Sequence, residues 1–305
     1  MEKEFLEWLG PRLTTNRHLR VGVGDDAAIL QLSRNGDCVV TSDMLTEGVD
    51  FRLADVDPGL IGRKSLAVNL SDLAAMACRP IAAIVALALP RQSSLELAVA
   101  LYEGLLPLAE EFDIVIAGGD TNVWDFGLVV SITAIGEPTT DAPWLRSGAR
   151  VGDAVLVTGD LGGSILGKHF DFQPRVREAM ALNRSYEISA AADISDGLLL
   201  DLSRLASASD CGAVLDLNSI PIAHTAKELA AADTDGGTPL EHALSDGEDF
   251  ELLFTSGIAE AARLTSDQPL DVKITSIGRM VPEKGLWQAG SSGERSPLEA
   301  KGFMH

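Results

Sequence analysis

The chain has 305 residues, of which 24 are basic and 45 are acidic, so its formal charge is −21. Such an acidic chain is not expected to bind nucleic acid or anionic membranes, because both need clustered Lys and Arg residues. The length favours two domains over one, and the 46% hydrophobic content is ample for buried cores. The widely spaced cysteines form no metal or disulfide pattern, and residues 1–20 lack the apolar core of a signal peptide. We therefore expect a cytoplasmic protein without a membrane helix.

The first half of the chain alternates between extended and helical patterns. We expect a glycine turn with two acids at 22–26, a buried strand at 38–43, a helix that starts at Pro58 and ends before Arg79–Pro80, a covered strand at 81–89 and an amphipathic helix at 93–112. A strand at 114–117 should lead into a glycine turn at 118–122. This alternation indicates layered α/β or α+β structure.

The segment at 138–152 is rich in Pro, Gly and Thr, which is typical of a domain boundary. We therefore predict an N-terminal domain at 1–140 and a C-terminal domain at 150–305. The second half repeats the alternation, with a strand at 154–157, a glycine turn at 158–163, a helix that opens at 191–197 and runs to about residue 209, and strands at 213–217, 252–255 and 272–277, the last of which should be the final strand.

The helix around residues 64–77 carries the most informative pattern. Its leucines recur at three- and four-residue steps, which is the period of one helical face. Asn69 and Asp72 interrupt this apolar run, and because they lie three residues apart they project from nearly one face. A carboxylate in such surroundings is costly to desolvate unless a positive group lies beside it. Few Lys or Arg residues are near in the sequence, so we expect a divalent metal ion to supply the charge.

Several other segments place Asp beside Gly or Ser at the end of an apolar strand or inside an apolar helix. Together with the helix motif they are residues 24–26, 41–43, 71–72, 118–121 and 193–197. Strand ends are where α/β proteins bind ligands, and carboxylates together with substrate phosphates are the usual ligands of Mg²⁺. Each segment by itself is also typical of a turn or a helix N-cap. Taken together they predict a site that holds several magnesium ions.

Standard nucleotide-binding and nucleophile motifs are missing from the sequence. It contains no Gly-x-x-x-x-Gly-Lys-Ser/Thr loop, no complete dinucleotide fingerprint and no kinase-like His-Arg-Asp loop. No serine has a nucleophile-elbow pattern, so we expect no covalent catalytic residue. None of the histidines lies at metal-ligand spacing from another, and we expect most of them to be exposed: His18, His169, His224, His242 and His305. An acidic protein that binds nucleotide and metal without turnover is an alternative.

Seven motifs follow one another at characteristic spacing between about residues 20 and 280. They are Gly22-Val-Gly-Asp-Asp26, Thr41-Ser-Asp43, Ala67-Val-Asn-Leu-Ser-Asp-Leu-Ala-Ala-Met76, Gly118-Gly-Asp-Thr121, Leu145-Arg-Ser-Gly-Ala149, Asp193-Ile-Ser-Asp-Gly197 and Gly247-Glu-Asp-Phe-Glu-Leu252. In order and spacing they resemble the thiamine-monophosphate kinase family of the aminoimidazole ribonucleotide synthetase-like superfamily. Single Asp-rich turns are shared with aminoimidazole ribonucleotide synthetase, selenophosphate synthetase and a hydrogenase maturation protein.

The resemblance implies a two-domain α/β fold and a homodimer in which N-terminal strands pair across the interface. It implies that the N-terminal domain binds ATP and magnesium, while the C-terminal domain completes the nucleotide and substrate site. The implied reaction is phosphorylation of thiamine monophosphate by ATP to thiamine diphosphate, by direct in-line transfer with several Mg²⁺ ions. Phosphoryl transfer needs positioning and charge neutralisation more than a nucleophilic side chain, which agrees with the motifs.

The resemblance also assigns roles to individual residues. Magnesium would be held by Asp26, Ser42, Asp43, Asp72, Asp120, Asp193 and Asp196. ATP would contact Phe112, Gly119, Asp120, Arg146 and Ser195, with the Phe112 ring on the adenine. Thiamine monophosphate would contact Asp50, Glu248 and Phe303.

Three features depart from the family pattern, and related activities stay open. Asp246 stands where the family usually has Gly, and the region 167–177 is shorter than in many members. The sequence also lacks the aromatic-rich tail that the family usually has after the position of Phe303. A related ATP-dependent enzyme that activates another small molecule, such as a ribonucleotide amide, is the alternative among enzymes. Selenophosphate synthesis is disfavoured because no Cys lies in an N-terminal glycine-rich loop.

Overall fold

The computed structural model describes residues 2–21, 29–32, 37–92, 94–140, 142–232, 237–290 and 294–303. The chain divides into two compact units, each with its own sheet. Unit 1 comprises Met1–Leu73 and Cys78–Asp141, and unit 2 comprises Ala74–Ala77 and Ala142–His305. No helix within the described ranges combines the length and apolar character of a membrane span. The expected glycine turn at 22–26 lies outside the described residues.

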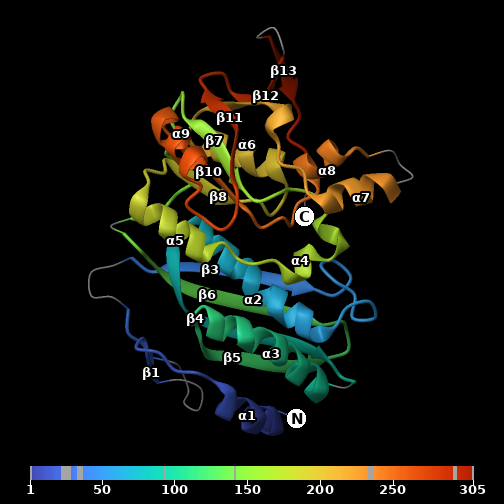
Figure 1. The fold of residues 1–305 in the computed structure, drawn as a ribbon. Helices are drawn as coiled ribbons and strands as arrows, with labels where there is room; N and C mark the ends of the chain where they lie inside the picture. The colour runs from blue at the N-terminus through green and yellow to red at the C-terminus, as the bar shows by residue number, and fades with distance from the viewer. Residues whose placement is uncertain are drawn as a thin grey trace. The chain divides into compact units, whose positions relative to one another are not determined.

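Unit 1 is built on a sheet with the strand order β3-β6-β4-β5. Its strands are β3 (Val39–Thr46), β4 (Cys78–Pro90), β5 (Val115–Trp124) and β6 (Val129–Pro138). The helix α3 (Ser94–Glu111) connects the parallel pair β4 and β5, whereas the other neighbours are antiparallel. Figure 1 shows α2 (Pro58–Ala75) and α3 lying across this sheet. A Cβ on Gly62 would lie 1.9 Å from the Leu101 carbonyl oxygen, so glycine allows α2 and α3 to approach closely.

The N-terminal segment packs on the helix α3 and on the strands β4 and β5. It forms α1 (Glu2–Leu9), the short helix η1 (Gly10–Arg12) and the antiparallel pair of β1 (Leu19–Val21) and β2 (Ile29–Leu30). Phe5 of α1 is 2% exposed, and its ring lies 5.1 Å from the ring of Tyr102 in α3. This aromatic contact attaches α1 to the helical layer of unit 1.

The strand register separates the two faces of the unit 1 sheet. Asp43 pairs with Ile132, which pairs with Val85, and both partners are buried. The next row contains Met44 and Ala86, which are exposed and therefore project from the other face. This second face, which we call the open face, carries the exposed apolar residues Val40, Met44 and Ile84.

Unit 2 contains a second sheet with the strand order β13-β12-β9-β11-β7-β10-β8. Its strands are β7 (Ala154–Thr158), β8 (Ala190–Asp193), β9 (Gly212–Leu215), β10 (Leu252–Ser256), β11 (Ile274–Val281), β12 (Gly285–Ala289) and β13 (Arg295–Leu298). Neighbours are antiparallel except for β12 and β9, which are parallel. Every residue of β7 and β10 is buried, as expected for central strands that are covered on both faces.

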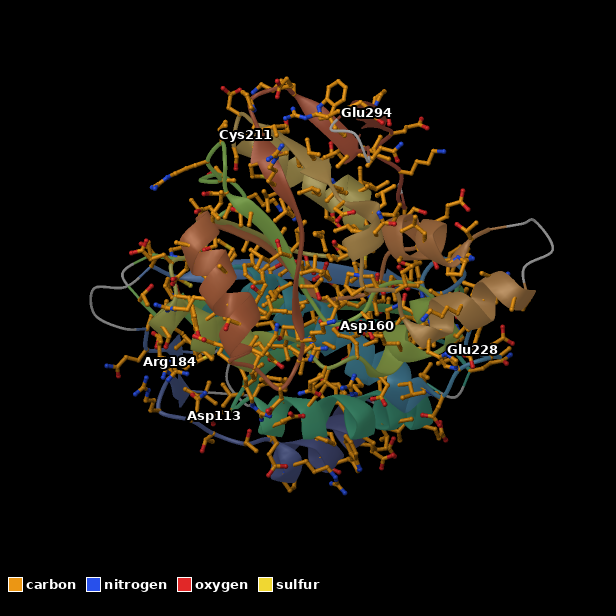
Figure 2. All side chains as sticks on the ribbon, turned by 45° about the horizontal axis from the view of Figure 1, so that its top comes forward. Asp113, Asp160, Arg184, Cys211, Glu228 and Glu294 are labelled. Carbon is orange, nitrogen blue, oxygen red and sulfur yellow. The ribbon has the colours of Figure 1, made fainter. Side chains whose placement is uncertain are left out.

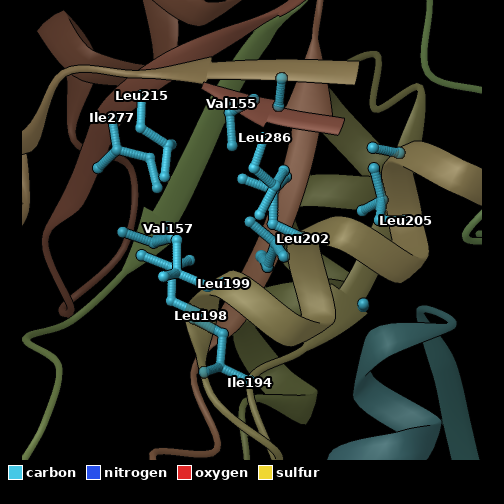
Figure 3. Packing of buried hydrophobic residues seen from close by; sticks show 14 of the residues in the cluster. Val155, Val157, Ile194, Leu198, Leu199, Leu202, Leu205, Leu215, Ile277 and Leu286 are labelled. Carbon is cyan, nitrogen blue, oxygen red and sulfur yellow. The ribbon is translucent and has the colours of Figure 1, made fainter. Parts of the chain in front are cut away.

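The helices of unit 2 surround this sheet. They are η2 (Ser164–Leu166), α4 (Lys168–Asp171), α5 (Val176–Ser185), α6 (Leu198–Ala208), η3 (Leu217–Ser219), α7 (His224–Ala232), α8 (Pro239–Ser245) and α9 (Ile258–Asp267). Figure 3 shows the core formed by α6 and the sheet, in which Leu198, Leu202 and Leu205 recur at helical spacing and are buried. The helix starts after Gly197, whose φ of +113° favours glycine. The core therefore fixes the loop that precedes α6.

Many of the predicted elements are confirmed, including the start of α2 at Pro58 and the alternation of strands and helices. Several predictions are wrong. The covered strand expected at 81–89 begins at Cys78, and Val40 of β3 and Ile84 of β4 are exposed instead of buried. Residues 190–193 form β8 where the start of a helix was expected, the expected glycine turn at 118–122 continues β5, and β12 and β13 follow the strand that was expected to be last. The glycines stay extended because β5 pairs with β4 as far as Trp124, and this ladder outweighs the turn preference of glycine.

Candidate functional site

In unit 1, β3 and α2 bring two of the predicted acids together. Thr41 and Asp43 lie two residues apart on β3, so both project from the face that is covered by helices. The Thr41 hydroxyl donates a hydrogen bond to Oδ2 of Asp72 on α2. The negative charge of Asp72 acts directly on Asp43. The apolar helix thus carries its carboxylate to a second carboxylate on the sheet.

The Asp43 carboxylate lacks the partners that usually stabilise a buried charge. Burial, followed by repulsion from Asp72, raises the pKa of Asp43 to about 7. Its Oδ2 atom is buried without a hydrogen-bond partner in the described part of the chain. The same holds for Oδ1 of Asn69, whose Nδ2 donates to the Ser65 carbonyl at 3.0 Å. Hard oxygen atoms without donors fit a divalent cation such as Mg²⁺.

Two other predicted metal ligands of unit 1, Asp120 and Ser42, do not join this pair. Asp120 pairs with Ala86 in the strand register, so its side chain projects from the open face, opposite to Asp43. Ser42 also lies on the open face, with its Oγ 2.9 Å from Oγ1 of Thr133. Asp26 lies outside the described residues. Within the described ranges, no three His, Cys, Asp or Glu side chains are grouped so that they could hold a metal ion.

The predicted nucleotide and substrate residues of unit 1 already have structural roles. Phe112 follows α3 and is 8% exposed, so most of its ring is covered. Asp50 closes the turn after β3, because its Oδ2 accepts a hydrogen bond from Thr46 N at 2.7 Å. Gly119 lies in β5, where a Cβ would lie 1.9 Å from the Val85 carbonyl oxygen. Contacts of Phe112, Gly119 and Asp50 with a ligand stay predictions.

Two loops of unit 2 run side by side: the loop after β8 (193–197) and the loop before β10 (247–251). Backbone hydrogen bonds join them, for example from Glu248 N to the Ser195 carbonyl at 2.6 Å. The C-terminal segment is joined to the 193–197 loop by a further backbone hydrogen bond of 2.9 Å. These bonds bring together predicted metal, nucleotide and substrate residues from three distant parts of the chain, namely Asp193, Ser195, Asp196, Glu248 and Phe303.

Asp201, in the first turn of α6, holds the 193–197 loop in place. Its Oδ2 accepts hydrogen bonds from the backbone N–H groups of Ser195 and Asp196, at 3.0 and 2.9 Å. Arg204 donates to the other oxygen at 3.0 Å and also pairs with the Asp196 carboxylate. Burial is the main reason that the pKa of Asp201 is raised to about 6. Asp201 was not among the predicted residues, although an acid in an apolar helix is the pattern that pointed to Asp72.

Glu251 is the centre of a buried ion network at the end of the 247–251 loop. Arg175 donates to both of its carboxylate oxygens at 2.7 Å. Lys168 Nζ lies 3.0 Å from Oε1, and the Thr158 hydroxyl donates to Oε2 at 2.8 Å. Burial by itself would raise the pKa of Glu251, but these hydrogen bonds and positive charges outweigh it and lower the pKa. The network fastens the loop to β7, α4 and the start of α5.

Backbone amides of the glycine turn at 158–163 bind two further acids. Asp249 is 1% exposed and accepts a hydrogen bond from Gly162 N with both oxygens, at 2.9 and 3.0 Å. Burial raises the pKa of Asp249 to about 7. Asp246 Oδ2 accepts from Gly163 N at 3.1 Å. The Gly162 and Gly163 amides of this turn are therefore occupied by carboxylates of the protein itself.

Arg146 lies in an exposed loop of unit 2. The Ser209 hydroxyl donates to its carbonyl at 2.9 Å, which fixes the backbone of the loop. The charge of Arg146 is among those that lower the pKa of Asp201 against the effect of burial. The guanidinium of Arg146 therefore acts on the same carboxylate that accepts hydrogen bonds from the 193–197 loop.

The expectation that most histidines are exposed is wrong for the described residues. His18 and His169 are 7% and 5% exposed, and His242 is partly buried beside Asp246. His224 is exposed and its Nε2 lies 3.3 Å from Glu228, which Figure 2 labels. The partner of the buried His169, Glu248, is distant in the sequence, so no local pattern indicates this contact.

Comparison with known proteins places this geometry in a family. Residues 24–137 match the model of the family "AIR synthase related protein, N-terminal domain". Residues 150–286 match the model of the family "AIR synthase related protein, C-terminal domain". A thiamine-monophosphate kinase from Rhodopirellula baltica is 43% identical over 100% of this chain and 97% of its own length. The chain belongs to the thiamine-monophosphate kinase family.

Two solved structures of the thiamine-monophosphate kinase family share the fold. The enzyme from Stenotrophomonas maltophilia K279a is 34% identical, with a TM-score of 0.81 over 96% of this chain and 97% of that one. AaThiL complexed with AMPPCP and TMP is 26% identical, with a TM-score of 0.77 over 99% of this chain and 94% of that one. The predicted family and the predicted two-domain α/β fold are therefore confirmed.

We expect Asp43→Asn to stabilise this family member more at pH 8 than at pH 5.5 in metal-free buffer. Because the folded-state pKa is raised from 3.8 to about 7, the folded state favours the protonated acid and loses stability as the pH rises between these values. Asn cannot ionise, so its advantage should grow by about 1–2 kcal/mol between the two conditions. Urea denaturation with EDTA measures the gain, and the exposed control Asp55→Asn should show no such growth.

The ion network yields a second stability prediction. Glu251→Gln should lower the free energy of unfolding by about 3–5 kcal/mol, because Arg175 and Lys168 lose the charge that compensates their own partial burial. The control Glu178→Gln removes a weaker partner of Arg175, 3.3 Å away, and should cost less than about 1 kcal/mol. Chemical denaturation of both variants measures the difference, and equal costs would contradict a central role for Glu251.

Proposed function

We propose that this protein transfers a phosphoryl group from ATP to thiamine monophosphate, giving thiamine diphosphate and ADP. The observation that carries the proposal is family membership over the whole chain, at 43% identity to a thiamine-monophosphate kinase. The AaThiL complex supports this pair of substrates, because AMPPCP is a non-hydrolysable analogue of ATP and TMP is taken as thiamine monophosphate. The meeting of the predicted residues on the paired loops of unit 2 supports it further.

The residues of unit 2 have the chemistry that these substrates need. The thiamine part of the substrate is a cation, and Glu248 offers a carboxylate that is 36% exposed. The Arg146 guanidinium suits phosphate oxygens, which it can contact with two parallel N–H donors. Ser195 already donates its backbone N–H to Asp201, so it would contact the nucleotide through its hydroxyl. Phe303 supplies an aromatic ring that is 50% exposed.

Magnesium is the metal that the acids fit best. Asp43 and Asp72 would hold it in unit 1, and Asp193 and Asp196 would do so in unit 2, while Asp26, Ser42 and Asp120 are assigned by motif. When bound, Mg²⁺ would neutralise phosphate charge and help to orient the phosphates. The partnerless Oδ2 of Asp43 and its raised pKa support this assignment, because a cation would stabilise the ionised carboxylate.

We propose direct transfer without a covalent enzyme intermediate. A phosphate oxygen of thiamine monophosphate forms a bond to the γ-phosphorus of ATP, and the bond from that phosphorus to the β–γ bridging oxygen breaks to release ADP. The chain contributes binding and orientation, for which the rigid 193–197 and 247–251 loops are suited. Neither step needs a nucleophilic side chain.

We also propose that the protein is a homodimer that uses the open face of the unit 1 sheet. Val40, Met44 and Ile84 on this face are 58%, 62% and 40% exposed. Exposed apolar residues gathered on one sheet face are typical of an interface between proteins. A second copy of the same face would be self-complementary, as a twofold interface requires.

The kinase proposal is tested by incubating the protein with ATP, Mg²⁺ and thiamine monophosphate and measuring thiamine diphosphate. Asp43→Asn and Asp120→Asn should lower kcat by about 100-fold or more, because charge stabilisation in the transition state is lost. Thermal denaturation should show that both variants stay folded. Asp125→Asn, an exposed acid that pairs with Arg91, is the control and should stay active. A folded wild type that forms no product would refute the proposal.

The dimer proposal predicts that Met44→Asp halves the mass in solution. A charge on the open face would be costly to bury against a second copy, so the mass should fall from twice the chain mass of 32.2 kDa to the chain mass itself. Light scattering after gel filtration measures this change. Val151→Asp, at an exposed apolar residue of unit 2, should leave the mass unchanged.

A further inference from the structure

The short helix α4 is fixed firmly against the 247–251 loop. Lys168, its first residue, lies 3.0 Å from the buried Glu251 carboxylate. Just after the helix, the ring of Phe172 stacks on the ring of Phe250, with 4.0 Å between centroids and 17° between planes. Both rings are buried, so an ion pair and an apolar contact hold the two segments together. Side chains between these two contacts have little freedom to move away from the loop.

His169 lies between these contacts and is held against Glu248. Its Nδ1 atom is 2.9 Å from Oε2 of Glu248, and the residue is 5% exposed. Because a carboxylate oxygen only accepts hydrogen bonds, the ring must carry a proton on Nδ1 to make this contact favourable. The ring is buried and its Nδ1 contacts one oxygen of Glu248, so it constrains the direction of that oxygen.

The backbone of Glu248 is constrained as well. Its φ is +53°, in the left-handed region that favours glycine, and it follows Gly247, whose φ is +77°. The hydrogen bond from Glu248 N to the Ser195 carbonyl, at 2.6 Å, holds this conformation. A glutamate side chain that is 36% exposed would ordinarily sample several rotamers. Here a fixed backbone and a buried imidazole restrict them while part of the carboxylate faces solvent.

We propose that His169 is a positioning residue that directs the Glu248 carboxylate toward the cationic thiamine part of the substrate. This inference rests on the proposed function, in which Glu248 contacts thiamine monophosphate. The thiazolium ring carries a permanent positive charge, and a carboxylate that is already oriented loses less entropy when it binds that charge. His169 acts through Glu248 and contacts no reacting atom. A purely structural histidine would affect stability without changing the affinity for one substrate.

The test compares steady-state constants of His169→Leu and His169→Asn. Leu fills the space without a donor, whereas Asn places its Nδ2 donor near the position of Nδ1. His169→Leu should raise KM for thiamine monophosphate about tenfold, as expected for a lost hydrogen bond to a charged group, with kcat and KM for ATP within about twofold of wild type. His169→Asn should keep KM for thiamine monophosphate within about threefold of wild type. The matched control is His224→Leu, at an exposed histidine of the same unit, which should change none of the constants.

Two further comparisons keep the test decisive if His169→Leu does not fold. The side-chain N–H donor of His169→Gln lies near the position of Nε2 of the imidazole instead of Nδ1. This variant should therefore raise KM for thiamine monophosphate, whereas His169→Asn should not. In a Glu248→Ala background, replacing His169 by Gln or Leu should raise KM no further, because both residues act through one carboxylate.

The possible outcomes separate the inference from the proposed function. An unchanged KM for thiamine monophosphate in folded His169→Leu overturns the inference and leaves the kinase activity intact. Equal rises in the Asn and Gln variants, or additive effects in the Glu248→Ala background, also overturn it. A folded wild-type protein that does not turn over overturns the proposed function, and the inference with it.

Discussion

The candidate site of unit 2 depends on the two hydrogen bonds that the Arg175 guanidinium donates to the buried Glu251 carboxylate. An ionised carboxylate that is 1% exposed is stable only when cations and donors surround it, and Arg175, Lys168 and Thr158 meet that need. These partners come from the residue before α5, from α4 and from β7, so stabilising one charge assembles three elements around the 247–251 loop. That loop in turn holds the 193–197 loop through backbone hydrogen bonds.

The buried acids of this protein fall into two groups that differ in what neutralises them. Glu251 has cationic partners within the chain, and its pKa is lowered. Asp43 faces another carboxylate, has an oxygen without a donor in the described residues, and its pKa is raised. The fold therefore supplies cationic partners for Glu251, whereas the surroundings of Asp43 are consistent with the proposal that a cation binds there. Asp249 shows that a raised pKa is not sufficient, because both of its oxygens are already bound by Gly162 N.

Local chemistry made some features predictable from the sequence and left others hidden. Pro58 is a good first residue of a helix, and the leucine spacing predicted the rest of α2. The relation of Asp43 to Asp120 was hidden, because one step of strand register decides which face a side chain occupies. The burial of His169 was hidden as well, since its partner Glu248 is brought close only by the folded chain. Motifs indicated the candidate acids, whose roles stay predictions, whereas the residues that contact those acids could be found only in the tertiary structure.

Asp246 contacts both His242 and the glycine turn at 158–163. Asp246 replaces the glycine that is usual in the family, and its carboxylate accepts a hydrogen bond from Gly163 N while lying 3.0 Å from His242 Nδ1. A relative with glycine at position 246 must satisfy the Gly163 amide in another way and gives a histidine at position 242 no carboxylate to contact. The acid at position 246 therefore links the histidine at position 242 to the glycine turn at 158–163.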